Sequence, residues 1–104
     1  MSSDSSGLTA AVADALKSVI DPELGYNIVD LGLVYDIVVH DDSARIRMTT
    51  TRPGCPATNA LKHGAEEAAG SVPGIAAVEV TMTWLPPWSP ELMSEAAKQR
   101  FGFA

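Results

Sequence analysis

The one cysteine of the chain, Cys55, is the residue best suited to chemistry, and it stands in the stretch Thr49-Thr50-Thr51-Arg52-Pro53-Gly54-Cys55-Pro56. Apolar and polar residues alternate before it, which predicts a strand. Apolar residues after Pro56 recur at helical spacing, which predicts a helix whose first position suits proline. Free N–H groups at a helix start stabilise negative charge, so we expect a presented, partly exposed and readily ionised thiol. Gly54 permits a bend that uncovers the sulfur. The alternative is a small buried apolar residue, as many free cysteines are.

Two carboxylates in the segment Asp21-Pro22-Glu23 form the second candidate site. Asp-Pro-Glu also makes turns without any function, so a structural role stays open. If this loop meets Cys55, its carboxylates would oppose ionisation of a free thiol, whereas a bound cation would favour the thiolate. The combination fits a metal or cluster site better than a free nucleophile, with Cys55, Asp21 and Glu23 as ligands. Thr51 could hydrogen-bond to the bound group.

A single thiolate cannot hold a metal–sulfur cluster, which usually takes four ligands. The site would have to be transient, or shared across a dimer or with a partner protein. His40 and His63 do not pair with the cysteine by spacing, and the sequence has no Gly-rich phosphate loop, Ser-His-Asp set or Cys-x-x-Cys motif.

The composition is that of a small soluble domain of 104 residues, 46% hydrophobic and 19% charged, with a formal net charge of −6. Negative charge argues against binding to nucleic acid or anionic membranes. No apolar run approaches the roughly 20 residues that span a bilayer, and the polar N-terminus lacks a signal-peptide pattern. One cysteine cannot form an internal disulfide, so we expect a cytoplasmic protein. Residues 1–7 are expected to be a disordered arm and 8–104 a single domain.

Apolar periodicity predicts an α+β fold in the order helix, strand, strand, helix, strand, helix. We expect a small mixed three-stranded sheet with helices packed on one face. Pro22 should end the first helix, and Ser89 should cap the last one. The expected elements are helix 8–20, loop 21–27, strand 33–40, turn 40–43, strand 44–51, helix 56–68, a break at 70–74, strand 78–84, an extended segment 85–88 and helix 90–97.

Four motifs together resemble the metal–sulfur cluster biosynthesis domain family, whose members include SufT-type and PaaD-type proteins. The motifs are Asp21-Pro22-Glu23, the stretch Asn27-Ile28-Val29-Asp30-Leu31-Gly32-Leu33-Val34-Tyr35, Pro53-Gly54-Cys55-Pro56 and Pro86-Pro87-Trp88. The resemblance implies a fold similar to the carboxy-terminal domain of NifU-type scaffolds and a role in iron–sulfur cluster assembly or maturation.

The resemblance also implies a functional centre at Cys55, with Asp21, Glu23 and Thr51 nearby. Arg52 stands where the family commonly has a small residue. A cysteine-rich tail of the PaaD type is absent, which favours a SufT-like protein.

The main hypothesis is therefore an assembly or carrier protein without turnover chemistry. It would bind iron or an iron–sulfur cluster transiently and serve assembly proteins and client apoproteins, with a homodimer as one arrangement. A second hypothesis is an adaptor that docks assembly machinery onto clients through an exposed Trp88 and the Pro86-Pro87 segment, although a tryptophan in that position is more often packed on the helix that follows. A third and weaker hypothesis is a thiol-dependent enzyme.

Overall fold

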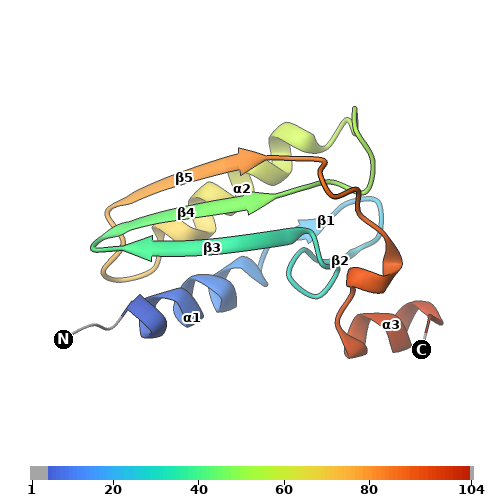
Figure 1. Cartoon of the computed structure of the whole chain (residues 1–104), viewed down its shortest axis with the longest axis horizontal. Coiled ribbons are helices and arrows are strands. Elements are labelled where there is room, and N and C mark those ends of the chain that lie inside the picture. Colours follow the sequence, from blue (N-terminus) through green and yellow to red (C-terminus); the bar gives the residue numbers. More distant parts are fainter. Residues whose placement is uncertain (1–4, 104) are drawn as a thin grey trace.

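Three α-helices, a three-stranded sheet and a two-stranded ladder make up residues 5–103, the part of the chain that the computed structural model describes (Figure 1). The elements in chain order are α1 (Ser5–Leu16), β1 (Ile20–Asp21), β2 (Tyr26–Asn27), β3 (Val34–His40), β4 (Ser43–Met48), α2 (Thr58–Gly70), β5 (Ala77–Met82), the 3₁₀ turn η1 (Pro90–Leu92) and α3 (Glu95–Phe101).

The sheet has the order β3-β4-β5 and is mixed, as predicted. Strands β3 and β4 form an antiparallel hairpin whose turn contains Asp41 at a φ of 56°, whereas β4 and β5 run parallel. Parallel neighbours need a crossover connection, and α2 supplies it. The C-terminal ends of both parallel strands therefore lie at the same end of the sheet, and the segments that follow them emerge side by side (Figure 1).

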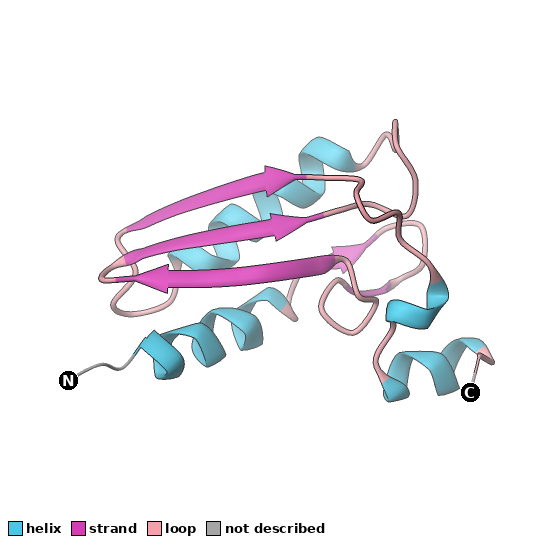
Figure 2. Ribbon diagram, viewed as in Figure 1, coloured by secondary structure: helices cyan, strands magenta, loops and turns pink. Residues whose placement is uncertain are grey.

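Helices α1 and α2 cover one face of the sheet and leave the other open (Figure 2). The pattern is clearest in β4, where Ala44, Ile46 and Met48 are buried and Arg45 and Arg47 are exposed, as the alternation predicts. The buried face meets apolar residues of the two helices, among them Val12, Leu16, Leu61, Ala65 and Ala69. This contact fixes the position of the segment that follows β4.

The first helix is displaced toward the N-terminus relative to the prediction. It begins at Ser5, inside the stretch 1–7 expected to be disordered, and ends at Leu16 rather than near Pro22. Residues 1–4 lie outside the described residues. The predicted helix included Val19 and Ile20, because apolar residues continue there at helical spacing. In the structure Ile20 is 51% exposed, and Ile20–Asp21 pairs with Tyr26–Asn27. The expected loop 21–27 is therefore a small antiparallel ladder closed by a turn.

Strand β4, the second strand of the predicted hairpin, ends earlier than predicted. Its alternation placed Thr49 on the water-facing side, yet Thr49 is fully buried. The ladder stops at Met48, and the Thr49 amide instead donates to the Leu33 carbonyl oxygen at 2.8 Å, next to an irregularity in the β3–β4 register. Strand alternation stops being informative where the regular pairing stops.

The C-terminal segment also departs from the prediction. Ser89 precedes only η1 and makes no capping hydrogen bond, whereas the Ser94 hydroxyl accepts a bond from the Ala97 amide at 3.2 Å and caps α3. Helix α3 lies beyond the end of the sheet (Figure 1). The prediction of an exposed Trp88 is wrong, because its indole is half-buried against the core and donates to the Leu31 carbonyl oxygen at 2.7 Å.

Among the described residues, no helix is long and apolar enough to cross a membrane.

Candidate functional site

The segment from Thr49 to Cys55, named here the cysteine loop, leaves the sheet at the end of β4. The Thr50 side chain is buried and holds the base of this loop. Its hydroxyl donates to the Arg52 carbonyl oxygen at 2.6 Å and accepts from the Trp84 indole nitrogen at 3.0 Å. Trp84 follows β5, so the parallel pairing of β4 and β5 brings these two residues together. Sequence reasoning missed both roles, although inward spacing marked Thr50 as buried.

Glycine is required at the bend of the cysteine loop. Gly54 has a φ of +78°, a region that other residues seldom adopt, and no atom lies within 4 Å of the position of an added Cβ. The requirement is therefore conformational and not a matter of space. The prediction of a glycine bend next to Cys55 is confirmed.

The prediction that Pro56 starts the second helix is wrong. Helix α2 begins at Thr58, whose amide and hydroxyl both donate to the Cys55 carbonyl oxygen, at 3.1 and 2.7 Å. Cys55 therefore lies three residues before the helix. The expected placement of Cys55 directly at the first turn of a helix is therefore not realised.

Asp21 is buried, with 1% of its surface exposed, and organises the turn that joins β1 to β2. Its Oδ1 atom accepts hydrogen bonds from the amides of Glu23 and Leu24, at 2.6 and 3.2 Å. Its Oδ2 atom is buried and has no hydrogen-bond partner among the described residues. A buried, unpartnered carboxylate oxygen is energetically unfavourable and marks a position where a donor or cation would be stabilised.

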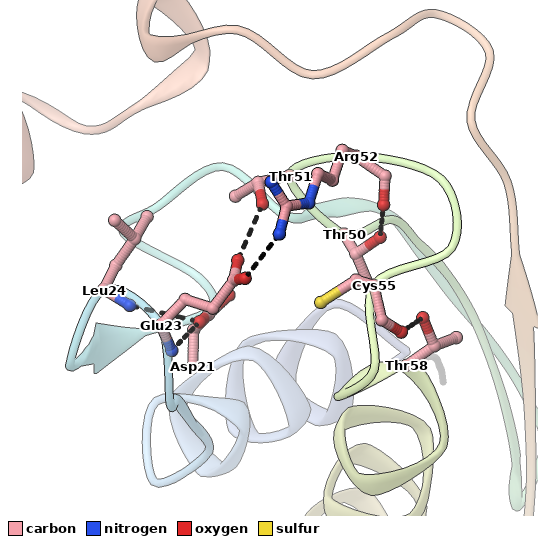
Figure 3. Close-up of polar contacts among 8 residues, drawn as sticks. All are labelled: Asp21, Glu23, Leu24, Thr50, Thr51, Arg52, Cys55 and Thr58. Carbon is pink, nitrogen blue, oxygen red and sulfur yellow. Dashed lines mark hydrogen bonds and ion pairs between the residues drawn. The ribbon is translucent and has the colours of Figure 1, made fainter.

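Glu23 joins this acidic turn to the cysteine loop. Its Oε1 atom accepts from the Thr51 hydroxyl at 3.2 Å, and its Oε2 atom lies 3.3 Å from Nη2 of Arg52 (Figure 3). The acidic turn and the cysteine loop, far apart in sequence, are therefore in contact. We name these paired contacts of Glu23 with Thr51 and Arg52 the clasp.

The Cys55 sulfur points from its loop toward Asp21 and Glu23 (Figure 3). The residue is only 4% exposed, so the prediction of a partly exposed thiol is wrong. It lies outside the main cluster of buried apolar residues in the described chain, and its side chain faces the acidic turn. Cys55 is thus buried, with its side chain directed toward the acidic turn (Figure 3).

No group of three or more His, Cys, Asp or Glu side chains within residues 5–103 is arranged to hold a metal ion. His40 pairs with Asp41 and His63 with Glu66, each at 3.3 Å and away from the cysteine loop. Chemically, the site offers one sulfur, one unpartnered carboxylate oxygen and a second carboxylate engaged in the clasp. Further ligands for a cluster would have to come from another molecule.

Known proteins resemble this chain in sequence and in fold. The profile of the family described as "Iron-sulfur cluster assembly protein" matches residues 9–82. The Fe-S protein maturation auxiliary factor YitW of Bacillus subtilis is 40% identical over 92 residues, covering 88% of this chain and 90% of that protein. The Fe-S protein maturation auxiliary factor SufT of Staphylococcus aureus is 41% identical over 85 residues, covering 81% and 97%. A solved structure of a domain of unknown function, DUF59, from Bacillus anthracis superimposes with a TM-score of 0.89 at 39% identity over 95% of each chain.

Proposed function

The chain belongs to the iron–sulfur cluster assembly protein family, and on this premise we propose that Cys55 is the residue through which it handles iron or a cluster. Its role is in cluster assembly or in the maturation of cluster proteins. The observation that carries the assignment to Cys55 is that its sulfur points toward Asp21 (Figure 3), whose buried Oδ2 atom has no hydrogen-bond partner among the described residues.

The proposed ligands are Cys55 and Asp21, joined by Glu23 when its carboxylate is released from the clasp. A cation at the gap would stabilise the thiolate and provide the partner that Asp21 Oδ2 lacks. Thr51, released in the same step, would hydrogen-bond to the bound group.

The cargo is iron or an iron–sulfur cluster held transiently, because the described chain provides fewer ligands than a cluster usually takes. We propose that a second chain of this protein, an assembly protein or a client apoprotein supplies the remaining thiolates. The protein would then pass on its cargo without turnover chemistry of its own. A single free thiol also fits the reducing cytoplasm.

Anaerobic reconstitution with ferrous iron and sulfide tests this proposal. The wild-type protein should develop sulfur-to-iron charge-transfer absorbance, and Cys55→Ser should abolish it. Asp21→Asn should bind less iron while keeping its turn, because an amide oxygen can still accept the bonds from Glu23 and Leu24. Asp41→Asn is the matched control, since Asp41 is an exposed carboxylate in the hairpin turn.

Equal absorbance in Cys55→Ser and the wild type would reject the proposal. Equal iron binding by Asp21→Asn and Asp41→Asn would remove Asp21 from the ligand set. Cluster content per chain, compared with the mass of the reconstituted species, distinguishes a site shared by two chains from one completed by a different protein.

The other two hypotheses have less support. Trp88 is half-buried and engaged with Leu31, which disfavours it as a docking surface for an adaptor, although Leu85, Pro86 and Pro87 are exposed. A thiol enzyme needs access of its substrate to sulfur, which the 4% exposure of Cys55 opposes.

A further inference from the structure

We propose that the clasp of Glu23 with Thr51 and Arg52 is a gate that controls access to the Cys55 sulfur. This inference rests on the proposed function for its biological meaning, but its physical content concerns only the exposure of the thiol. A cysteine residue that is only 4% exposed cannot exchange ligands with another protein unless part of its surroundings moves. The sulfur points toward Glu23, whose side chain bridges the acidic turn and the cysteine loop (Figure 3), so these two segments are the ones that would have to separate.

The acidic turn is the fixed side of the gate. Asp21 binds two successive amides of the turn, its carbonyl oxygen accepts from Gly25 at 2.7 Å, and the β1–β2 ladder closes the base. These short-range bonds keep the turn in shape whether or not Glu23 reaches across. Glu23 is the residue of this turn that bonds to the cysteine loop through its side chain.

The cysteine loop is the side that moves. Its base is anchored through Thr50 to Trp84, and its far end through the Cys55 carbonyl oxygen to Thr58. Between these anchors, Gly54 adopts a positive φ with open space around it. A glycine there can change conformation without steric penalty from its own side chain. The side chains of Thr51 and Arg52 in this loop both bond to Glu23, while the Arg52 carbonyl oxygen is held by the Thr50 hydroxyl.

The clasp is weak enough to open. The Arg52 and Glu23 side chains are 69% and 36% exposed, and exposed ion pairs are screened by water and salt. Opening would uncover the sulfur and free the Glu23 carboxylate and the Thr51 hydroxyl in one step. Access to Cys55 and completion of the proposed ligand set are thus coupled.

Alkylation of the native protein by a neutral maleimide measures the gate directly, because Cys55 is the only cysteine. Limiting rates are taken from the alkaline plateau of the pH–rate profile, so that differences in thiol ionisation do not contribute. Glu23→Gln and Arg52→Met should each raise the limiting rate about 1.5- to 5-fold, the range expected when an exposed ion pair is lost. Added salt should raise the wild-type rate and leave both variants unchanged.

The two variants change the local charge in opposite directions, which separates a gate from a simple electric field. Loss of the clasp predicts a faster limiting rate in both variants. A field effect, which acts through thiol ionisation, predicts unchanged limiting rates and, below the plateau, one variant faster and one slower. Glu79→Gln is the matched control, since Arg45 and Glu79 form an exposed pair at 3.4 Å on the open face of the sheet. Its rate should equal that of the wild type.

Wild-type rates in Glu23→Gln and Arg52→Met, or equal acceleration in Glu79→Gln, would overturn the gate. The labelling needs no iron, so its outcome is independent of reconstitution. A gate without iron binding would reject the proposed function alone, and iron binding without a gate would reject this inference alone.

Discussion

Replacing Gly32 by alanine should be the most damaging change of a single glycine in this fold. Gly32 has a φ of +79°, and a Cβ added there would lie 2.6 Å from the Leu92 carbonyl carbon and in contact with the carbonyl oxygen. Leu92 belongs to η1, so the obstructing atoms are backbone and cannot rotate away. The substitution must therefore displace the segment that leads into α3.

The magnitude follows from two contributions. A non-glycine residue in the left-handed region costs about 1–2 kcal/mol, and overpacking typically adds about 1–3 kcal/mol. Gly32→Ala should thus lose about 2–5 kcal/mol, a large part of the roughly 5–15 kcal/mol that stabilises such a domain. The melting temperature should fall by roughly 10 °C or more.

Gly54→Ala supplies the matched control. Its φ of +78° is nearly the same, but its added Cβ meets nothing within 4 Å, so only the backbone contribution of about 1–2 kcal/mol applies. Urea unfolding followed by far-ultraviolet circular dichroism gives both free energies, and an unchanged m value shows that the unfolded states are comparable. Equal losses in the two variants would refute the steric argument at Leu92.

Two further predictions concern the cap of α3 and the carboxylate of Asp30. Ser94→Ala removes the acceptor of the Ala97 amide and should lower the free energy of unfolding by about 1 kcal/mol, whereas Ser89→Ala, which removes no cap, should be close to neutral in the same urea titration. Hydrogen bonds from Asn27 and then Ser94 lower the pKa of Asp30. The folded state therefore releases this proton at lower pH than the unfolded chain. The stability that results is complete above about pH 4 and is lost as pH falls through the folded pKa. Asp30→Asn should flatten the acid side of a plot of urea midpoint against pH, and a variant with an unchanged acid slope would contradict the assignment.

The sheet could be predicted from sequence because its information is local. In β4, buried Ile46 alternates with exposed Arg45 and Arg47, and a period of two needs no knowledge of the partner strands. The same reasoning failed at Ile20, where an apolar residue at helical spacing belongs to the β1–β2 ladder. The spacing of apolar residues does not reveal where a helix stops if the next element happens to continue the same apolar pattern.

The candidate site was less accessible to sequence reasoning. Its residue types were identified, and the importance of the bend at Gly54 was correct. The burial of Cys55 was not, because the contacts that bring the acidic turn to the cysteine loop join Glu23 to Thr51 and Arg52, 28 and 29 positions away in sequence. The delayed start of α2 at Thr58 also depends on hydrogen bonds to the Cys55 carbonyl oxygen that propensity does not encode.

The hydrogen bond from Trp84 to Thr50 gives this protein an optical probe of its own. Indole emission responds to hydrogen bonding and solvent, and Thr50 in turn holds the Arg52 carbonyl oxygen. A rearrangement near the sulfur would therefore reach a natural fluorophore through two bonds. The other tryptophan, Trp88, is tied to Leu31 and provides an internal reference. Movements of this region could thus be followed in the unlabelled chain.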